Sequence, residues 1–184
     1  PEIKKNIKYF YPNVNLELLN KITNGQAETC LLGLGLVDKE KPLTISACDN
    51  GIIYDKIKFS NYFKNNSIDI IVWGCEKFPG AKRNPNMYGW IQHENFNIKK
   101  IHVKKIYQNP FLDPVIVGTF TFRKASLFIE SVKSLFLKGS KVNGEYYVDS
   151  CINNAIDLGM NVAYFPVDYF LCWGTPDDLK TYIY

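Results

Sequence analysis

The order of apolar and polar segments along the chain predicts an α/β fold with a mostly parallel sheet. Residues 42–48 and 68–74 are continuous apolar runs that end in turn residues, the pattern of strands covered on both faces. A segment with helical apolar spacing precedes each run, and this alternation is typical of strand–helix–strand crossover units. Residues 115–122 form a third run, rich in the β-branched and aromatic side chains that strands prefer.

The first half of the chain is expected to supply two helix–strand pairs. A helix is predicted within residues 16–36, followed by the strand at 42–48, which an Asp-Asn-Gly turn ends. Residues 57–63 are predicted to form a second helix, and residues 68–74 the next buried strand. These four segments carry the prediction of a parallel arrangement.

The middle of the chain has a different character. Residues 79–87 combine Pro, Gly, Lys, Arg and Asn, a composition that predicts a loop. Residues 88–94 and 100–105 alternate partly between apolar and polar side chains, which predicts a hairpin around residues 95–97. The strand at 115–122 follows this hairpin.

The last third returns to helices and one strand. Residues 125–137 have the apolar spacing of an amphipathic helix, and residues 148–158 are expected to form another helix that ends at Gly159. A strand is predicted at residues 161–167, and the sequence Thr-Pro-Asp-Asp at 175–178 is typical of a helix start. No repeat or linker interrupts the chain, so residues 1–184 are predicted to form one domain.

Composition excludes several classes of function. Hydrophobic residues make up 46% of the 184 residues and charged residues 22%, as in a folded globular protein. The net charge of +4 comes from scattered lysines, which predicts no nucleic-acid partner. No apolar stretch is long enough to span a membrane, and no signal peptide is present, so a cytoplasmic location without membrane contact is expected. The cysteines lack the close pairs of metal sites and are expected to be reduced thiols: Cys30, Cys48, Cys75, Cys151 and Cys172.

Asp49 directly follows the buried run at 42–48. Ligands of open α/β sheets sit beyond the carboxyl ends of strands, so this carboxylate is expected to point into the ligand cleft. A carboxylate in that position suits a Mg²⁺ ion that also holds substrate phosphates. The local alternative is an Asx turn, because Asp-Asn-Gly forms turns by itself.

Six segments in a fixed order resemble the sugar-phosphate nucleotidylyltransferase family, whose members join a nucleoside triphosphate to a sugar 1-phosphate. The closing WGTPDDL is the most specific of the six, and the resemblance rests on the ordered series and not on any single segment. The segments run along nearly the whole chain: ITNGQAETCLLGL, PLTISACDNG, NMYGWIQHE, DPVIVGTFTFR, GEYYVDSCIN and FPVDYFLCWGTPDDL.

The resemblance implies a Rossmann-like three-layer α/β/α fold with a mixed sheet, like that of type A glycosyltransferases. It implies that Gly25 and Gln26 read the nucleobase and that Asp49 binds Mg²⁺ between the two substrates. The local alternative for Gln26 is a partner in helix capping. If the resemblance holds, Asp49 faces the same crevice as the Tyr-Gly pair at 88–89 and the Gly-Glu pair at 144–145.

The same resemblance implies that Gly89, Gly118 and Glu145 contact the sugar. Glycine lets a ligand approach the backbone, whereas the local alternatives are a bulge for Gly89 and close strand packing for Gly118. For Glu145 the alternative is a carboxylate attracted by a helix start. A family lysine grips the sugar phosphate, and Lys104 or Lys105 fits that position; alternation along the strand favours Lys104.

Two departures from the family pattern bear on catalysis. The glycine-rich G-x-G-x-R loop that cradles the triphosphate is absent, which predicts an N-terminally incomplete domain that lacks roughly 70–80 residues and has no turnover alone. The second metal-binding aspartate of the family is Cys172 here, and a neutral thiol is a poor Mg²⁺ ligand. Asp168 is four residues away, over ~13 Å along a strand, too far to substitute directly.

Three hypotheses of function follow. The first is part of a nucleotidyltransferase that makes a nucleotide sugar for surface polysaccharide synthesis, with a nucleoside triphosphate and a sugar 1-phosphate as partners and Mg²⁺ as cofactor. The second is a nucleotide-sugar-binding or regulatory module without turnover, which Cys172 favours. The third is a metal-dependent glycosyltransferase, for which Asp-Asn-Gly is a poor D-x-D motif. The sequence names neither base nor sugar and leaves homo-oligomerisation open.

Overall fold

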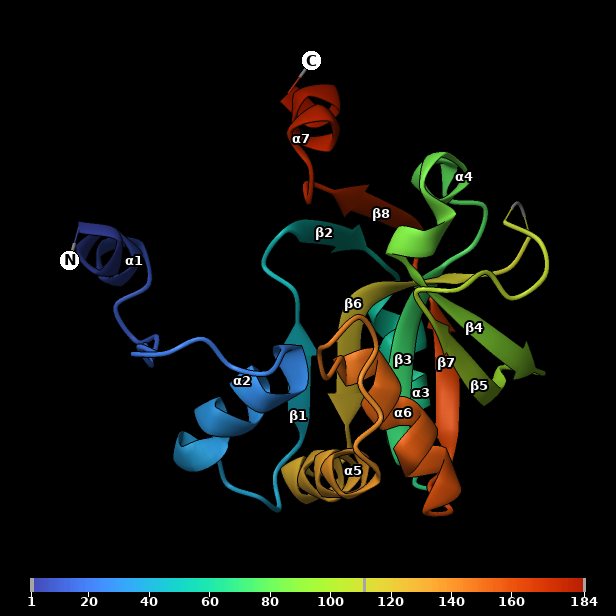
Figure 1. Cartoon of the computed structure of the whole chain (residues 1–184), viewed down its shortest axis with the longest axis horizontal. Coiled ribbons are helices and arrows are strands. Elements are labelled where there is room, and N and C mark those ends of the chain that lie inside the picture. Colours follow the sequence, from blue (N-terminus) through green and yellow to red (C-terminus); the bar gives the residue numbers. More distant parts are fainter. Residues whose placement is uncertain (1, 111, 184) are drawn as a thin grey trace.

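A six-stranded mixed sheet forms the centre of the protein (Figure 1). The computed structural model describes residues 2–110 and 112–183. The strands lie in the order β1-β6-β3-β7-β5-β4, and β4 also pairs with β6. Their bounds are β1 Leu43–Ser46, β3 Ile70–Cys75, β4 Gly89–Glu94, β5 Asn97–Val103, β6 Val115–Phe122 and β7 Val162–Pro166.

The prediction of a mostly parallel sheet is wrong. Among the described residues only β3 and β7 pair in parallel, while β6 runs antiparallel to both β1 and β3. A parallel neighbour requires a crossover connection, which is usually a helix. The residues between β3 and β6 instead contain short helical turns and the β4–β5 hairpin, so β6 returns antiparallel to β3.

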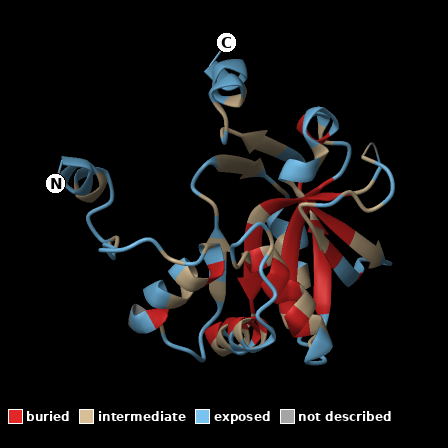
Figure 2. Ribbon diagram, viewed as in Figure 1, coloured by how far each residue is buried: buried red, intermediate tan, exposed pale blue. Residues whose placement is uncertain are grey.

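Two apolar clusters cover the two faces of the sheet, because successive side chains of a strand point to opposite faces. On β3, Ile70 and Val72 belong to one cluster, whereas Ile71 and Trp73 belong to the other. The first cluster packs against three helices, and the second against one long helix, a small ribbon and the short helix Pro79–Arg83; the red strands of Figure 2 mark the buried centre. These elements are α2 (Gln26–Gly33), α5 (Ala125–Lys138) and α6 (Val148–Asp157) on one face, and α3 (Lys56–Lys64) with β2 (Asn50–Ile53) and β8 (Tyr169–Cys172) on the other.

Local sequence explains several element ends. The Asp55 side chain accepts hydrogen bonds from the Ile57 and Lys58 amides and caps α3. Gly139 ends α5 in the left-handed region, with φ 63°. The predicted hairpin is confirmed, and residues 95 and 96 both have positive φ, as tight hairpin turns of the type I′ class require.

Two other predictions change in detail. The helix within residues 16–36 is confined to α2 and a short 3-10 turn, η1 (Leu34–Leu36). The predicted loop at 79–87 is wrong, since it forms α4 (Pro79–Arg83) and η2 (Pro85–Met87). Each of these turns starts with proline, which suits the first turn of a helix because its missing amide is unpaired there in any case.

Both ends of the described chain project from the body (Figures 1 and 2). The N-terminal α1 (Glu2–Phe10) and the C-terminal α7 (Pro176–Ile183) contain no buried residue. Within residues 2–110 and 112–183, no helix has the length and apolar character needed to cross a membrane.

Candidate functional site

A cavity of about 730 Å³ opens between the sheet edge, the start of α6 and the β2–β8 ribbon. Its wall comes from segments far apart in sequence: the start of α2, the β1–β2 turn, the start of β4, the middle of β6 and the end of β8. Every site residue predicted from the sequence lines it, although what each residue binds stays a prediction. These residues are Gly25, Gln26, Asp49, Gly89, Lys104, Gly118 and Glu145.

Asp49 stands in a turn after β1, as the sequence predicts, although β1 ends earlier than expected, at Ser46, and the turn leads into β2, which was not predicted. Its carbonyl accepts a hydrogen bond of 2.8 Å from the Trp173 amide, which ties this turn to the end of β8. A Cβ atom added to Gly174 would lie 3.2 Å from Asp49 Oδ2, so a glycine there leaves room beside the carboxylate. Within the described part of the chain, no three His, Cys, Asp or Glu side chains are grouped so that they could hold a metal ion by themselves.

Cys172 lies beside this carboxylate. The β2–β8 pairing sets Cys172 opposite Asn50, the residue that follows Asp49. Burial raises the pKa of the Cys172 thiol above its usual value, and the nearby carboxylates of Asp178 and Asp49 raise it further. The thiol is therefore neutral at neutral pH. Asp168 does not line the cavity, and its amide donates to the Ile53 carbonyl at the other end of the ribbon.

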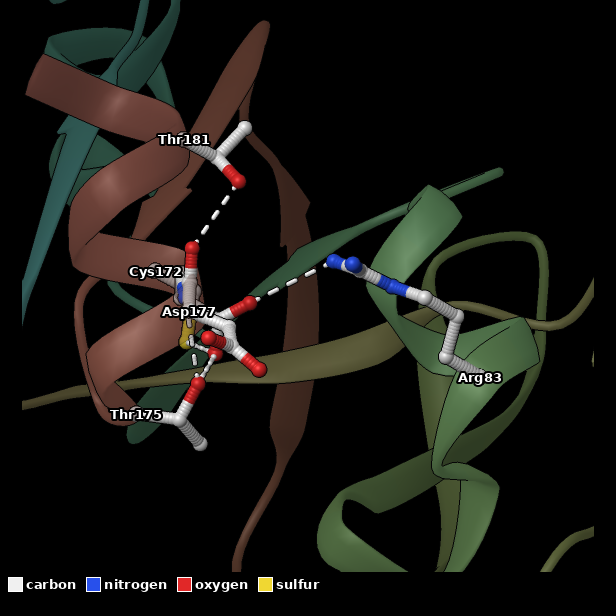
Figure 3. A network of polar contacts seen from close by, with 6 residues as sticks. Arg83, Cys172, Thr175, Asp177 and Thr181 are labelled. Carbon is white, nitrogen blue, oxygen red and sulfur yellow. Dashed lines mark hydrogen bonds and ion pairs between the residues drawn. The ribbon is translucent and has the colours of Figure 1, made fainter. Parts of the chain in front are cut away.

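A polar network behind Cys172 joins α7 to α4 (Figure 3). Arg83 reaches from α4 to the Asp178 carboxylate, with an Nη2–Oδ1 distance of 3.3 Å. Thr175 Oγ1 lies 2.7 Å from Asp178 Oδ2 and accepts a hydrogen bond from the Asp178 amide, a reciprocal cap at the start of α7. Burial raises the pKa of Tyr88 to about 12, helped by Cys172 and Asp178. Tyr88 and Cys172 therefore contribute neutral side chains to the cavity wall beside Asp49.

The start of α2 is docked against the segment before α6. The Ala27 amide donates to the Tyr146 carbonyl at 2.9 Å, and the Tyr146 amide donates to the Asn24 carbonyl at 2.8 Å. A Cβ atom on Gly25 would lie 2.7 Å from the Tyr146 nitrogen, so only glycine permits this approach. Glu28 accepts hydrogen bonds from Asn24 and performs the local capping. Gln26 has no such capping contact among the described residues, and its side chain lines the cavity.

The two other predicted glycines also mark close approaches. Gly118 interrupts β6 with φ 73°, and a Cβ atom there would meet Ala47 at 3.0 Å. A Cβ atom on Gly89 would collide with the carboxylate of Asp149, on the first turn of α6. Both positions therefore need glycine for packing as well as for access to the cavity.

Of the two candidate lysines, Lys104 lines the cavity and Lys105 lines a separate groove. Lys104 follows β5 with φ 53°, and its ammonium group donates to the Met87 carbonyl. The Lys104 Nζ atom also lies 5.3 Å from the centre of the Tyr147 ring. This left-handed backbone turns the Lys104 side chain toward α6.

Asp149 is a cavity residue that the sequence prediction missed. Burial raises the pKa of the Asp149 carboxyl to about 6, although the charge of Lys104 opposes this shift. Asp149 is half-buried, and a carboxyl with a raised pKa in a cavity is characteristic of functional sites. Asp149 belongs to the segment GEYYVDSCIN, whose resemblance to the family was the only available signal, and an acidic residue in the first turn of a helix is also common for structural reasons.

No family model matches the sequence, and no curated protein matches it. Solved structures match over almost the whole chain. The nucleoside-diphosphate-sugar pyrophosphorylase of Vibrio cholerae RC9 has a TM-score of 0.74 at 18% identity, over 99% of this chain and 75% of its own. The inositol-1-phosphate CTP transferase of T. maritima has a TM-score of 0.72 at 16% identity, over 99% and 69%.

A third match has the same character. A Bacillus anthracis protein described as a glucose-1-phosphate thymidylyltransferase, solved with sucrose, has a TM-score of 0.70 at 16% identity, over 98% of this chain and 69% of its own. At these identities the similarity establishes the fold. The chain therefore shares the mixed α/β fold of nucleotide-sugar pyrophosphorylases and sugar-phosphate nucleotidyltransferases.

Proposed function

We propose that the cavity is the substrate site of a nucleotidyltransferase that joins a nucleoside triphosphate to a sugar 1-phosphate and releases pyrophosphate. One observation carries the proposal. Residues chosen from five of the six resembling segments, together with Lys104, line a single cavity in a chain that shares its fold with such enzymes. Chance would have scattered these residues over several surfaces.

The reaction needs positioning more than covalent chemistry. An oxygen of the sugar phosphate attacks the α-phosphorus of the triphosphate in line. A new phosphorus–oxygen bond forms, and the bond to the oxygen that bridges to the β-phosphate breaks as pyrophosphate leaves. Lys104 binds the sugar phosphate, Gly25 and Gln26 contact the base, and Gly89, Gly118 and Glu145 border the sugar.

The residues of the cavity fit a Mg²⁺ ion only together with the substrates. Asp49 provides one carboxylate, and Mg²⁺ is often held by one or two carboxylates, substrate phosphates and water. The neutral thiol of Cys172 does not add a ligand, since Mg²⁺ prefers oxygen. A bound Mg²⁺ would supply neutralisation of phosphate charge.

The proposal also covers the layer arrangement of the fold and the use that the cell makes of the product. We interpret the fold as a Rossmann-like α/β/α sandwich, because α5 and α6 pack on one face of the sheet and α3 on the other. A nucleotide sugar made here would serve surface polysaccharide synthesis in the cytoplasm, as expected from the sequence.

Cys172 favours a second candidate, a module that binds a nucleotide sugar without turnover. Titration calorimetry of the 184-residue chain with nucleotide sugars tests the site itself, because both candidates require binding. Pyrophosphate release then separates them, measured on the protein in the form that its host produces. Absence of nucleotide-sugar binding would contradict both candidates.

The substitution Asp49→Asn tests the metal-binding carboxylate. It removes the negative charge with little change in shape, and we expect loss of Mg²⁺-dependent pyrophosphate release, by about 100-fold or more. The matched control is Asp168→Asn, which alters an exposed carboxylate outside the cavity and should leave release unchanged. Unchanged turnover in Asp49→Asn would exclude this carboxylate from catalysis.

The substitution Glu145→Ala tests the sugar contact. Glu145 is placed at the sugar side of the cavity, so its loss should raise KM for the sugar phosphate more than KM for the nucleotide, by roughly tenfold. Steady-state kinetics with each substrate varied in turn provides the measurement. A larger rise in KM for the nucleotide than for the sugar phosphate would contradict the sugar contact and assign Glu145 to the nucleotide.

A further inference from the structure

Asp49 stands at the point where the chain leaves the main sheet for the β2–β8 ribbon. The strand β1 ends at Ser46, and β2 starts at Asn50 and pairs with β8. Asp49 is exposed, and within residues 2–110 and 112–183 no hydrogen bond or ion pair involves its carboxylate. The direction of this carboxylate therefore depends on what holds the backbone of the turn.

Two hydrogen bonds tie the turn to neighbouring carbonyl groups of β6. At the start of the turn, the Ala47 amide donates to the Gly118 carbonyl at 2.9 Å. At its end, Nδ2 of the Asn50 side chain donates to the Val117 carbonyl at 3.0 Å. Residues 48 and 49 alone separate these two anchors. The carboxylate of the second therefore sits on a short span of chain that is fixed at both ends.

The conformation of β6 makes room for the Asn50 carboxamide. Gly118 has φ 73°, in the left-handed region that favours glycine. A Cβ atom there would lie 3.0 Å from the Cβ atom of Ala47 and 3.2 Å from Nδ2 of Asn50. A side chain at position 118 would press on both anchors of the turn, so the glycine and the carboxamide fit together as a pair.

The ribbon side of the turn is held by backbone groups. The Trp173 amide donates to the Asp49 carbonyl at 2.8 Å, and Asn50 pairs with Cys172 in the ribbon. Any side chain at position 50 permits these contacts, whereas the bond to the Val117 carbonyl requires a side-chain donor of suitable length. The Asn50 carboxamide therefore fastens the start of the ribbon to the main sheet.

We propose that Asn50 is a positioning residue for Asp49: its carboxamide fixes the turn on β6 so that the Asp49 carboxylate faces the metal ion proposed in the cavity. This inference rests on the proposed function and adds to it a residue that acts through Asp49. Groups that orient a metal ligand typically change metal affinity by roughly 10- to 100-fold when they are removed. A ligand misplaced by about 1 Å is enough for such a loss.

The test measures how much a divalent metal ion tightens the binding of a nucleotide sugar. Titration calorimetry identifies the tightest binder among ADP-, CDP-, GDP-, UDP- and dTDP-glucose and gives its Kd with Mn²⁺, in place of Mg²⁺, and with EDTA. The metal gain is the Kd in EDTA divided by the Kd in Mn²⁺. The wild type should show a clear metal gain, and Asp49→Asn should abolish it.

The variant Asn50→Leu keeps the size of the side chain and removes its donor. It should lower the metal gain by about tenfold, or to the level of Asp49→Asn, while the Kd in EDTA stays within about twofold of the wild type. Asn50 also lines the cavity, and a direct contact with the ligand would instead weaken binding in both conditions. Asn50→Ala should give the same result, which excludes a packing defect caused by the leucine.

Asn153→Leu is the matched control. Nδ2 of Asn153 donates to the Ile101 carbonyl at 2.8 Å, so this variant also removes a carboxamide that anchors a strand, but outside the cavity. It should lower the free energy of unfolding and keep the full metal gain. An equal loss of metal gain in this control would overturn the inference, because the effect would then report stability alone.

The two proposals fail in different ways. If Asp49→Asn abolishes the metal gain but folded Asn50→Leu and Asn50→Ala keep it, the positioning role is overturned and the proposed function stands. If the wild type binds no nucleotide sugar, or binds it equally well without metal, the role proposed for Asp49 fails and the inference fails with it.

Discussion

Asp149 is a carboxyl group whose ionised form the fold disfavours. Its pKa is raised from 3.8 to about 6 by burial, against the attraction of Lys104. Lys104 is the cation that faces it, while Tyr147 and Cys151 are neutral groups whose own pKa values its charge raises. An ionised group that the folded state disfavours lowers the free energy of unfolding, and such destabilising groups are common at functional sites.

Asp149→Asn should therefore stabilise the protein above about pH 6. Below the unfolded pKa of 3.8 the carboxyl is protonated in both states and the substitution has little effect. As pH rises through the folded pKa of about 6, the wild type loses stability and the variant does not. We expect the variant to gain about 2 kcal/mol near pH 8, measured by urea unfolding at several pH values. A gain independent of pH would contradict the burial of an ionised group.

At the residue scale the sequence predicted positions that line one cavity, while what each of them binds stays a prediction. The cavity position of Asp49 was predicted from a purely local pattern, an apolar run followed directly by a carboxylate. Alternation along an expected strand at 100–105 favoured Lys104 over Lys105, and Lys104 does line the cavity, but it lies beyond the end of β5 in a left-handed conformation that this argument did not foresee. Asp149 escaped prediction because its environment depends on Gly89, a residue of another element against which its carboxylate lies. No local pattern reports such a contact.

At the scale of single elements, Gly139 illustrates how backbone conformation ends a helix. Its φ of 63° closes α5, and its amide donates to the carbonyls of Leu135 and Phe136. A Cβ atom there would touch nothing within 4 Å, so the cost of a side chain is purely conformational.

Gly139→Ala should lower the free energy of unfolding by about 1 kcal/mol, or about 2–4 °C in Tm. Gly33→Ala is the matched control, because Gly33 is helical, with φ −66°, and is equally open around its Cβ position. That control should stabilise the protein by about 0.5 kcal/mol. Thermal unfolding of both variants provides the measurement, and equal shifts would contradict the conformational explanation.

Elements with strong local patterns were predicted well, and those defined by distant partners were not. The strand Val115–Phe122 and the start of α5 at Ala125 match the prediction, because their apolar spacing is regular. The strands β2 and β8 were not predicted, since they are short and pair only with each other across the chain. The sheet direction was misjudged because strand pairing is a property of connections and not of single segments.

At the scale of the whole molecule, the N-terminal segment stands apart from the rest. The helix α1 has no buried residue, and the hydrogen bonds of Lys8, Tyr11 and Val14 join partners within residues 2–21. Both apolar clusters are built from residues 27 onward.

Deletion of residues 2–21 should leave the Tm of the remaining chain within about 2 °C of the intact chain, since little apolar area is uncovered. Thermal unfolding of the two chains gives the comparison, and nucleotide-sugar titration shows whether the cavity persists. A large fall in Tm would show that the segment packs on the body.

The cavity wall has a consequence for how the protein acquires its function. The contacts that close it, between α2 and Tyr146 and between β2 and β8, join segments from opposite ends of the chain. Contacts of large sequence separation form slowly, because the loop between them must first be ordered. During synthesis the sheet core can therefore assemble before the cavity is closed, and the cavity wall is complete only when β8 has docked on β2.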